Sequence, residues 1–294
     1  MITIDSIWSD VQQVRDRGPL VHNITNYVVM NSTANALLAV GAAPVMAHAI
    51  QEVADMTAIA NALVINIGTL SEQWVEAMAL AMQRARERGI PIVVDPVGAG
   101  ATPYRTRTVR ELIAATAPTI IRGNASEIMA VAADGRGPQG DGERQQTSRN
   151  QVPRSTRRTD SAGPETQGVD SVAASDMALE AARALHARHG AVIAVTGEVD
   201  YVVAADVVRI TGGHPLMARV TGTGCTASAL CAAFAAVNDV TSVATAHALA
   251  ALAAAGASAG RRSRGPGTMQ LHLYDELHTL TRAQLATRVS VEVP

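Results

Sequence analysis

Short apolar runs alternate with longer helical patterns along most of this chain, and this alternation constrains its fold more than any other feature. Runs rich in valine, isoleucine and alanine predict buried strands, because a strand covered on both faces carries apolar side chains on both. Strands that alternate with helices indicate a three-layer α/β fold with a mainly parallel central sheet flanked by helices. The predicted strands are Ala43–Met46, Ala62–Asn66, Pro91–Asp95, Thr119–Arg122 and Ala191–Thr196.

Helical patterns fill the intervals between these strands. Two further apolar runs, Tyr201–Ala204 and Val207–Thr211, are separated by two residues and predict an antiparallel hairpin. From Thr223 onward the chain is predicted to be helical. The most apolar stretch, Val243–Gly260, contains His247 and is dominated by alanine, which favours a packed helix over a membrane span. The earlier predicted helices are Asn26–Val40, Glu52–Ala60, Ser71–Arg88, Arg105–Ala115 and Ala125–Ala133.

The composition is that of one globular domain with one interruption. The chain has 294 residues, of which 48% are hydrophobic and 17% charged, and we expect a single domain over residues 1–294. The stretch Gly135–Ser171 is rich in Gly, Pro, Gln, Ser, Thr and Arg and cannot bury enough apolar surface to order itself. It predicts a mobile polar insertion. The alternatives are a linker between two domains or, through its arginines, a weak anion-binding arm.

Charge and cysteine content limit the possible partners. The net charge of -2 gives no general reason to bind nucleic acid or an anionic membrane, and we expect neither. All 24 basic residues are arginines, which excludes a Schiff-base lysine or the lysine of a P-loop kinase. Cys225 and Cys231 are too few to build a zinc site. Met1–Asp10 lacks the apolar core of a signal peptide, so we expect a cytoplasmic protein.

A glycine-punctuated turn, Thr221–Thr226, leads directly into a helical run of small residues. Glycines let backbone N–H groups crowd an anion, and the positive end of the following helix dipole favours phosphate. The turn, with Thr223 and Gly224, therefore predicts a phosphate cradle. At its edge we expect the helix dipole to lower the pKa of Cys225 and make the thiol a proton acceptor. The alternative is an ordinary strand-to-helix turn with a buried cysteine.

Polar residues follow three of the predicted strands, at the sheet edge where α/β proteins bind ligands. Asp95 and Glu127 can hold Mg²⁺ directly or through water, although Asp95 also suits a turn before Pro96. Glu127 also suits a capping box with Asn124, and both roles can coexist. Arg122 has the fork geometry that clamps phosphate, and Ala194–Gly197 delivers the hydroxyl of Thr196.

Amide side chains gather near the N-terminus, in Val21–Asn31. Asparagine at a helix start is usually a cap, but several neutral hydrogen-bonding groups beside the apolar Pro44–Met46 also suit a small uncharged heterocycle or alcohol. Met46 has a polarizable sulfur that tolerates a ring.

Taken together, these motifs resemble the hydroxyethylthiazole kinase family, which belongs to the ribokinase-like superfamily. Seven blocks occur in the family's order over about Asn23 to Thr226, with a weaker echo at Gly265–Thr268. The insertion at Gly135–Ser171 is longer and more polar than the family's usual connection, but it interrupts none of the blocks. The blocks are His22–Asn26, Pro44–Ala47, Asn66–Leu70, Val94–Ala99, Arg122–Glu127, Val195–Gly197 and Gly222–Cys225.

The resemblance implies transfer of the ATP γ-phosphoryl group to the primary hydroxyl of 4-methyl-5-(2-hydroxyethyl)thiazole, a step of thiamine salvage. It also implies a homotrimer with active sites at the subunit interfaces. The family's cysteine matches Cys225. The implied site residues are Met46, Gly222 and Asn23 for the thiazole, Arg122 and Thr196 for ATP, and Asp95 and Glu127 for magnesium.

Three alternatives remain. A hydroxymethylpyrimidine kinase and a dehydratase that repairs hydrated nicotinamide cofactors share the fold, but Cys225 in place of Asp and the Asn23–Asn26 block argue against both. A binding protein without turnover would not require Asp95, Arg122, Glu127 and the glycine turn together.

Overall fold

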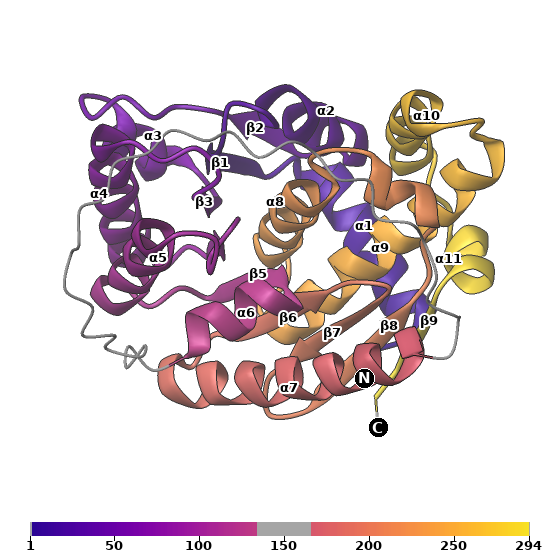
Figure 1. Cartoon of the computed structure of the whole chain (residues 1–294). Coiled ribbons are helices and arrows are strands. Elements are labelled where there is room, and N and C mark those ends of the chain that lie inside the picture. Colours follow the sequence, from indigo (N-terminus) through magenta and orange to yellow (C-terminus); the bar gives the residue numbers. More distant parts are fainter. Residues whose placement is uncertain (1, 134–165, 294) are drawn as a thin grey trace, which may run out of the picture.

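The computed structural model describes residues 2–133 and 166–293, which form one nine-stranded sheet between two layers of helices (Figure 1). The strand order is β2-β1-β3-β4-β5-β6-β7-β8-β9, and the pairs from β2 to β6 are parallel while those from β6 to β9 are antiparallel. The strands are β1 Leu20–Ile24, β2 Ala43–Val45, β3 Ala62–Asn66, β4 Ile92–Asp95, β5 Ile120–Asn124, β6 Val192–Thr196, β7 Val199–Val203, β8 Val207–Thr211 and β9 Ser290–Glu292. The prediction of a three-layer, mainly parallel α/β fold is confirmed.

The helices divide between the two faces of the sheet. One layer contains α1 Ile4–Arg17, α2 Met30–Val40, α8 Thr223–Ala235, α9 Thr241–Arg262, α10 Pro266–His278 and α11 Arg282–Arg288. The other contains α3 Val53–Ile59, α4 Glu72–Arg88, α5 Pro103–Ala115, α6 Ala125–Ala132 and α7 Thr166–His189. The central strands contribute side chains to both layers: in β3, Val64 faces the first core and Leu63 and Ile65 face the second.

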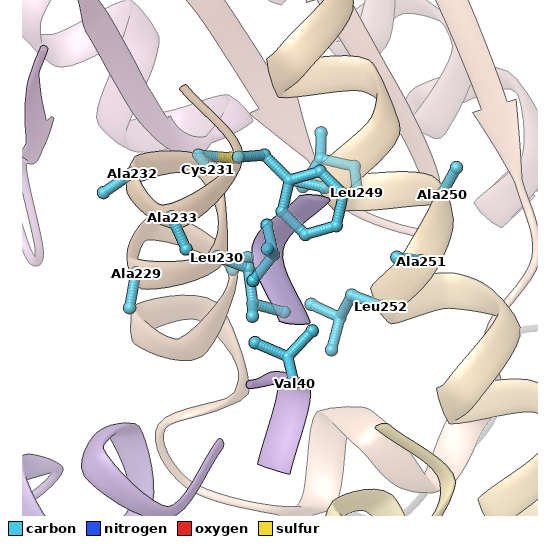
Figure 2. Packing of buried hydrophobic residues seen from close by; sticks show 14 of the residues in the cluster. Val40, Ala229, Leu230, Cys231, Ala232, Ala233, Leu249, Ala250, Ala251 and Leu252 are labelled. Carbon is cyan, nitrogen blue, oxygen red and sulfur yellow. The ribbon is translucent and has the colours of Figure 1, made fainter. Parts of the chain in front are cut away.

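Helices α8 and α9 pack against each other at the centre of the first layer. Figure 2 shows Leu230 of α8 and Leu252 of α9 meeting beside Val40, among alanines from both helices. Alanine lets two helix backbones approach closely, which explains why so small a set of side chains fills this core. α9 is long and apolar enough to cross a membrane, but 89% of its most apolar window is buried inside the protein, as the packed-helix prediction required.

A buried polar cluster fixes α1 to α9. Nδ1 of His247 lies 2.6 Å from Asp10 Oδ2, and its Nε2 lies 3.2 Å from Ser6 Oγ. Asn238 Nδ2 donates a further hydrogen bond to Asp10 Oδ2 at 2.6 Å. His247 and Asp10 are almost fully buried, so each supplies the partner that the other needs away from water.

Most predicted elements agree with the structure to within a few residues, although one helix begins later than predicted and strand β1 was not predicted. The helix predicted from Asn26 begins at Met30, because the residues before it form strand β1 and a connection. The hairpin of β7 and β8 is confirmed. The predicted insertion Gly135–Ser171 lies outside the described residues except for Thr166–Ser171, which belong to α7. A polar composition did not prevent helix here, because the helix continues into residues that pack on the sheet.

Candidate active site

A glycine precedes the first turn of α8, at a position where the structure has no space for a side chain. Gly222 is the N-cap, with φ of 86°, and a Cβ there would lie 2.9 Å from Val29 Cγ1 and 3.0 Å from Ser32 Oγ. A side chain at this position would be both strained and crowded. The next three residues, Thr223, Gly224 and Cys225, begin the helix, so their N–H groups have no carbonyl partner within it. This is the geometry that binds an anion.

Arg122, Thr196 and Gly224 come together beside this turn. Arg122 lies on β5 and is 8% exposed, and its guanidinium donates a short hydrogen bond to Thr196 Oγ1 on β6. A Cβ on Gly224 would lie 2.6 Å from Arg122 Nη1, so only glycine lets the guanidinium approach the turn this closely. The positive charge therefore adds to the field of the helix N-terminus.

These residues line one end of a cavity of about 1040 Å³. The cavity extends from Arg122, Thr196 and the Thr223–Gly224 turn along β7 and β8 to Leu252 and Ala253 in the middle of α9. Apolar side chains such as Ile210 and Leu252 line its other end. A charged end and an apolar end suit a ligand that carries phosphates on one side and a flat ring on the other.

The cavity also contains a carboxylate that sequence reasoning missed. Asp200 lies at the start of the hairpin, its Oδ1 accepts a hydrogen bond from Gly197 N at 3.0 Å, and it lines the cavity with Arg122. Burial raises the pKa of Asp200 to about 6. The sequence pattern of β7 does not distinguish Asp200 as a site residue. Its place in the site depends on residues from other segments that the fold brings to the same cavity.

On the other side of the turn, Asn66 joins four groups. Its Nδ2 donates to Asp95 Oδ2 at 2.9 Å and to Cys225 Sγ at 3.1 Å. Its Oδ1 accepts hydrogen bonds from Asn26 Nδ2 at 2.9 Å and Gly68 N at 3.0 Å. Sequence reasoning placed Asn26 only among the N-terminal amides and Asn66 only in a family block, and it connected neither of them with Cys225. The available signal was position: Asn66 ends β3 and pairs in register with Asp95, which ends β4.

The expected low pKa of Cys225 was wrong. Burial, followed by the negative charge of Asp95, raises the pKa of this thiol to about 11, and the hydrogen bonds from Asn66 and Asn26 offset only part of that effect. The helix N-terminus is present as expected, but a half-buried sulfur near a carboxylate is governed by desolvation and repulsion. At neutral pH the sulfur is a thiol and not a thiolate.

Asp95 has one satisfied oxygen and one free one. It is fully buried, and its Oδ2 accepts from Asn66 Nδ2 and from Ser228 Oγ at 2.8 Å, with Arg122 Nη1 at 3.7 Å. Its Oδ1 has no hydrogen-bond partner. Burial raises the pKa of Asp95 to about 6, and the charge of Glu127 adds to that rise. A buried, unpartnered carboxylate oxygen fits a cation ligand.

Glu127 forms the predicted capping box. Its Oε2 accepts from Asn124 N at 2.9 Å while Asn124 Oδ1 accepts from Glu127 N at 2.9 Å. Its Oε1 accepts from Gly98 N at 2.8 Å, which ties the loop after β4 to α6. No group of three or more His, Cys, Asp or Glu side chains gathers within the described residues. Asp95 and Glu127 thus fit a metal held partly by water and by ligand oxygens.

The predicted thiazole residues lie nearer the β2 edge of the sheet. Met46 directly follows β2 and is half-buried. Asn23 is buried in β1, where its Nδ2 donates to Val21 O at 2.8 Å and its Oδ1 has no partner. Besides Asn66, the amide that reaches the sulfur belongs to Asn26 and not to Asn23: Asn26 Nδ2 lies 3.6 Å from Cys225 Sγ. Gly222 belongs to both the phosphate-binding turn and the surroundings of Cys225, because it is the N-cap of the helix that carries Cys225.

A family model described as the hydroxyethylthiazole kinase family matches residues 11–159 and 153–283. The chain is 50% identical to the hydroxyethylthiazole kinase of Syntrophus aciditrophicus over 291 residues, which cover 99% of this chain and 98% of the relative. It superposes on the solved hydroxyethylthiazole kinase of Pyrococcus horikoshii with a TM-score of 0.81 and 38% identity, covering 99% of both chains. A ribokinase-like protein of Enterococcus faecalis, at 12% identity and a TM-score of 0.62 over 97% of this chain and 91% of its own, shares the fold.

Proposed function

This chain belongs to the hydroxyethylthiazole kinase family, and from that premise we propose that it transfers the γ-phosphoryl group of ATP to the primary hydroxyl of 4-methyl-5-(2-hydroxyethyl)thiazole, a step of thiamine salvage. One observation carries the assignment of the site: the open first turn of α8 lies between the large cavity and the Asn66–Cys225 cluster. A phosphoryl group at this turn has room for the nucleotide on one side and an acceptor position on the other.

The nucleotide occupies the cavity with its phosphates at the charged end. Arg122 neutralises phosphate oxygens, Thr196 orients the guanidinium through their shared hydrogen bond, and the N–H groups of Thr223, Gly224 and Cys225 receive the transferring group. These donors are fixed before the reaction begins, so they stabilise the charge that spreads over the phosphoryl oxygens without reorganisation.

The alcohol lies against Cys225, with Met46, Gly222 and Asn23 around the thiazole ring. Because the Cys225 pKa is about 11, the neutral thiol holds the hydroxyl by hydrogen bonding and is a poor proton acceptor at neutral pH. Phosphoryl transfer passes through a loose transition state that needs little proton abstraction, so positioning provides most of the acceleration. The Asn66 and Asn26 amides fix the sulfur in place.

We further propose that Asp95 and Glu127 hold Mg²⁺. The metal supplies charge neutralisation for the polyphosphate when bound. The free Oδ1 of Asp95 is the atom best placed to take a ligand, while Glu127, whose oxygens both accept backbone hydrogen bonds, acts through water.

Three features beyond the site belong to the same proposal: a single domain, a cytoplasmic location and a homotrimer with interface active sites. The family membership supports the trimer. Sedimentation equilibrium of the full chain tests it, and a mass of three chains is the expected result.

The decisive experiment is an ADP-release assay with ATP, Mg²⁺ and the thiazole alcohol, run beside the corresponding pyrimidine alcohol. We expect turnover with the thiazole alcohol and much slower release with the pyrimidine. Faster release with the pyrimidine would change the substrate assignment. Calorimetric binding of the thiazole without any ADP release would show a binding protein in place of a kinase.

A further inference from the structure

One wall of the cavity is a short segment without α or β structure. We call residues 212–220, between β8 and α8 and including the 3₁₀ helix η1 Pro215–Arg219, the pocket wall. Its residues Gly212, Gly213, His214, Pro215, Met217 and Ala218 line the cavity. Such a segment has few hydrogen bonds of its own, so its position depends on what it packs against.

Two glycines of α9 lie directly beneath the pocket wall. A Cβ on Gly256 would lie 2.3 Å from Met217 Sδ and 2.8 Å from its Cε. A Cβ on Gly260 would lie 2.1 Å from His214 Cγ and 2.5 Å from its Cβ. Both glycines are one turn apart on the same face of a helix, and both are buried. Because Gly256 and Gly260 have no side chains, Met217 and His214 can pack directly against the backbone of α9. We call these two positions the seats of Met217 and His214.

Backbone contacts fix the same register. Gly213 N donates to Ala253 O of α9 at 3.0 Å, one turn before Gly256. Leu216 N donates to His214 Nδ1 at 3.2 Å, so the His214 ring that rests on Gly260 also caps η1. Movement of the His214 ring therefore disturbs the cap of η1, and the Met217 side chain must leave its place over Gly256 or shift together with the wall.

The pocket wall is also tied to the phosphate end of the cavity. Thr223 Oγ1, in the first turn of α8, lies 3.1 Å from Met217 O and 2.9 Å from Val220 O, and donates to these carbonyls. A displacement of Met217 is thus transmitted to the residue that begins the phosphate-binding turn.

We propose that Gly256 and Gly260 are positioning residues for the nucleotide: they lie outside the cavity, and they set the position of the wall that contacts ATP and of the turn that contacts its phosphates. The inference rests on the proposed function, since it takes the cavity as the ATP site. It predicts a selective defect in ATP binding, because the thiazole side of the turn has no contact with the pocket wall among those described above.

The test compares Gly256→Ala and Gly260→Ala with Gly267→Ala. Gly267 is also a helical glycine, but a Cβ there meets nothing within 4 Å, so it controls for the general effect of adding a methyl group to a helix. We expect the KM for ATP to rise about tenfold in each α9 variant, with the KM for the thiazole alcohol within about twofold of wild type, because only nucleotide binding is lost. Gly267→Ala leaves both constants unchanged.

A double variant separates positioning from loss of stability. Met217→Ala removes the side chain that a methyl on Gly256 would meet, so Gly256→Ala should raise the KM for ATP much less in the Met217→Ala background than in wild type. An equal rise in both backgrounds would overturn the proposal, and so would wild-type ATP binding in Gly256→Ala and Gly260→Ala.

Should Gly256→Ala be too unstable to assay, Gly256→Ala with Met217→Ala replaces it; recovery of folding and of ATP binding supports the seat, and continued unfolding overturns it. The proposed function has its own test, because it is contradicted if the wild-type protein itself releases no ADP.

Discussion

The two sides of the turn at the start of α8 differ in how much space they leave for a ligand. On the nucleotide side, Arg122, Thr196 and Gly224 border a cavity of about 1040 Å³. On the acceptor side, Asn66 and Asp95 are fully buried and bonded to one another, and neither lines that cavity. A large ligand therefore has a preformed site, while the small one meets groups already fixed by mutual hydrogen bonds. We therefore expect the first side to supply most of the binding energy and the second to orient the acceptor.

The largest expected effect comes from removing the charge that serves both sides. Arg122→Ala should lower kcat/KM about 10³-fold, since the guanidinium is proposed to contact phosphate and its loss leaves Asp95 without its ion pair. Steady-state kinetics against ATP measure the change. Arg84→Ala, which removes an exposed arginine paired with Glu87, is the control and should leave kcat/KM unaltered. A decrease of less than tenfold would place the polyphosphate elsewhere.

Asp95→Asn tests whether the ionised carboxylate of Asp95, on the acceptor side, destabilises the fold. The pKa of Asp95 is about 6 in the folded chain against an ordinary 3.8, so the folded protein disfavours the carboxylate. The resulting destabilisation is negligible well below pH 3.8, grows between pH 3.8 and about 6, and is constant at higher pH. Without metal, Asp95→Asn should unfold with a free energy about 3 kcal/mol higher than wild type at pH 8, and nearly equal to it at about pH 3.

Urea denaturation at the two pH values gives this comparison. Asp239→Asn changes an exposed carboxylate in the loop between α8 and α9 and serves as the matched control. Loss of stability in Asp95→Asn at pH 8 would contradict the prediction. The same variant should lose activity, because it lacks the charged oxygen that is proposed to hold Mg²⁺.

Cys225→Ala tests the acceptor side alone. We expect kcat to fall roughly 10- to 100-fold, at or below the low end for a positioned acid–base group, because the neutral thiol orients the hydroxyl without needing to take its proton. ATP binding, followed by calorimetry, should be unchanged. Cys231→Ala alters a buried thiol two turns further along α8 and is expected to keep kcat while lowering the melting temperature. An unaltered kcat in Cys225→Ala would remove the sulfur from the reaction.

The pH profile is the smallest effect and the sharpest distinction between the roles of the sulfur. With a pKa of about 11, the thiolate fraction of Cys225 rises about tenfold per pH unit between pH 7 and 9. A thiolate base would raise kcat by about 10² over this range. We expect less than a threefold change, measured at saturating ATP and thiazole alcohol. A slope near one would restore the thiolate to the mechanism.

The regular parts of the fold could be predicted because their signals are local. β3 and β8 begin and end at the predicted residues, since β3 is a nearly continuous apolar run and β8 is rich in valine and isoleucine. β1 was missed because its centre carries polar side chains. His22 and Asn23 are buried there, and His22 is satisfied by Thr57 and by the carbonyl of Ala47, which lie far along the chain. Polar residues in a buried strand are interpretable only when their partners are known.

The residues of the candidate site also divide into those with a local sequence signal and those without one. Arg122, Thr196 and Gly224 were identified individually by type and by position after a strand or at a helix start, and the structure brings them together. The link through Asn66 and the seating of the pocket wall on α9 were not accessible, because both depend on contacts between distant segments. The Cys225 pKa was predicted in the wrong direction for a related reason: the dipole is a local property, whereas burial belongs to the tertiary structure.

The buried pair of Asp10 and His247 has a practical consequence for anyone handling this protein. A version of the chain shortened to begin near Gly18 would remove the acidic partner of His247 and expose to water the imidazole and the apolar face of α9 that α1 covers. Solubility tags are therefore better attached ahead of Ile2 through a flexible spacer, and crystallisation variants are better trimmed within surface loops. Helix α1 is thus part of the packed layer that contains α9, and the stability of that layer depends on it.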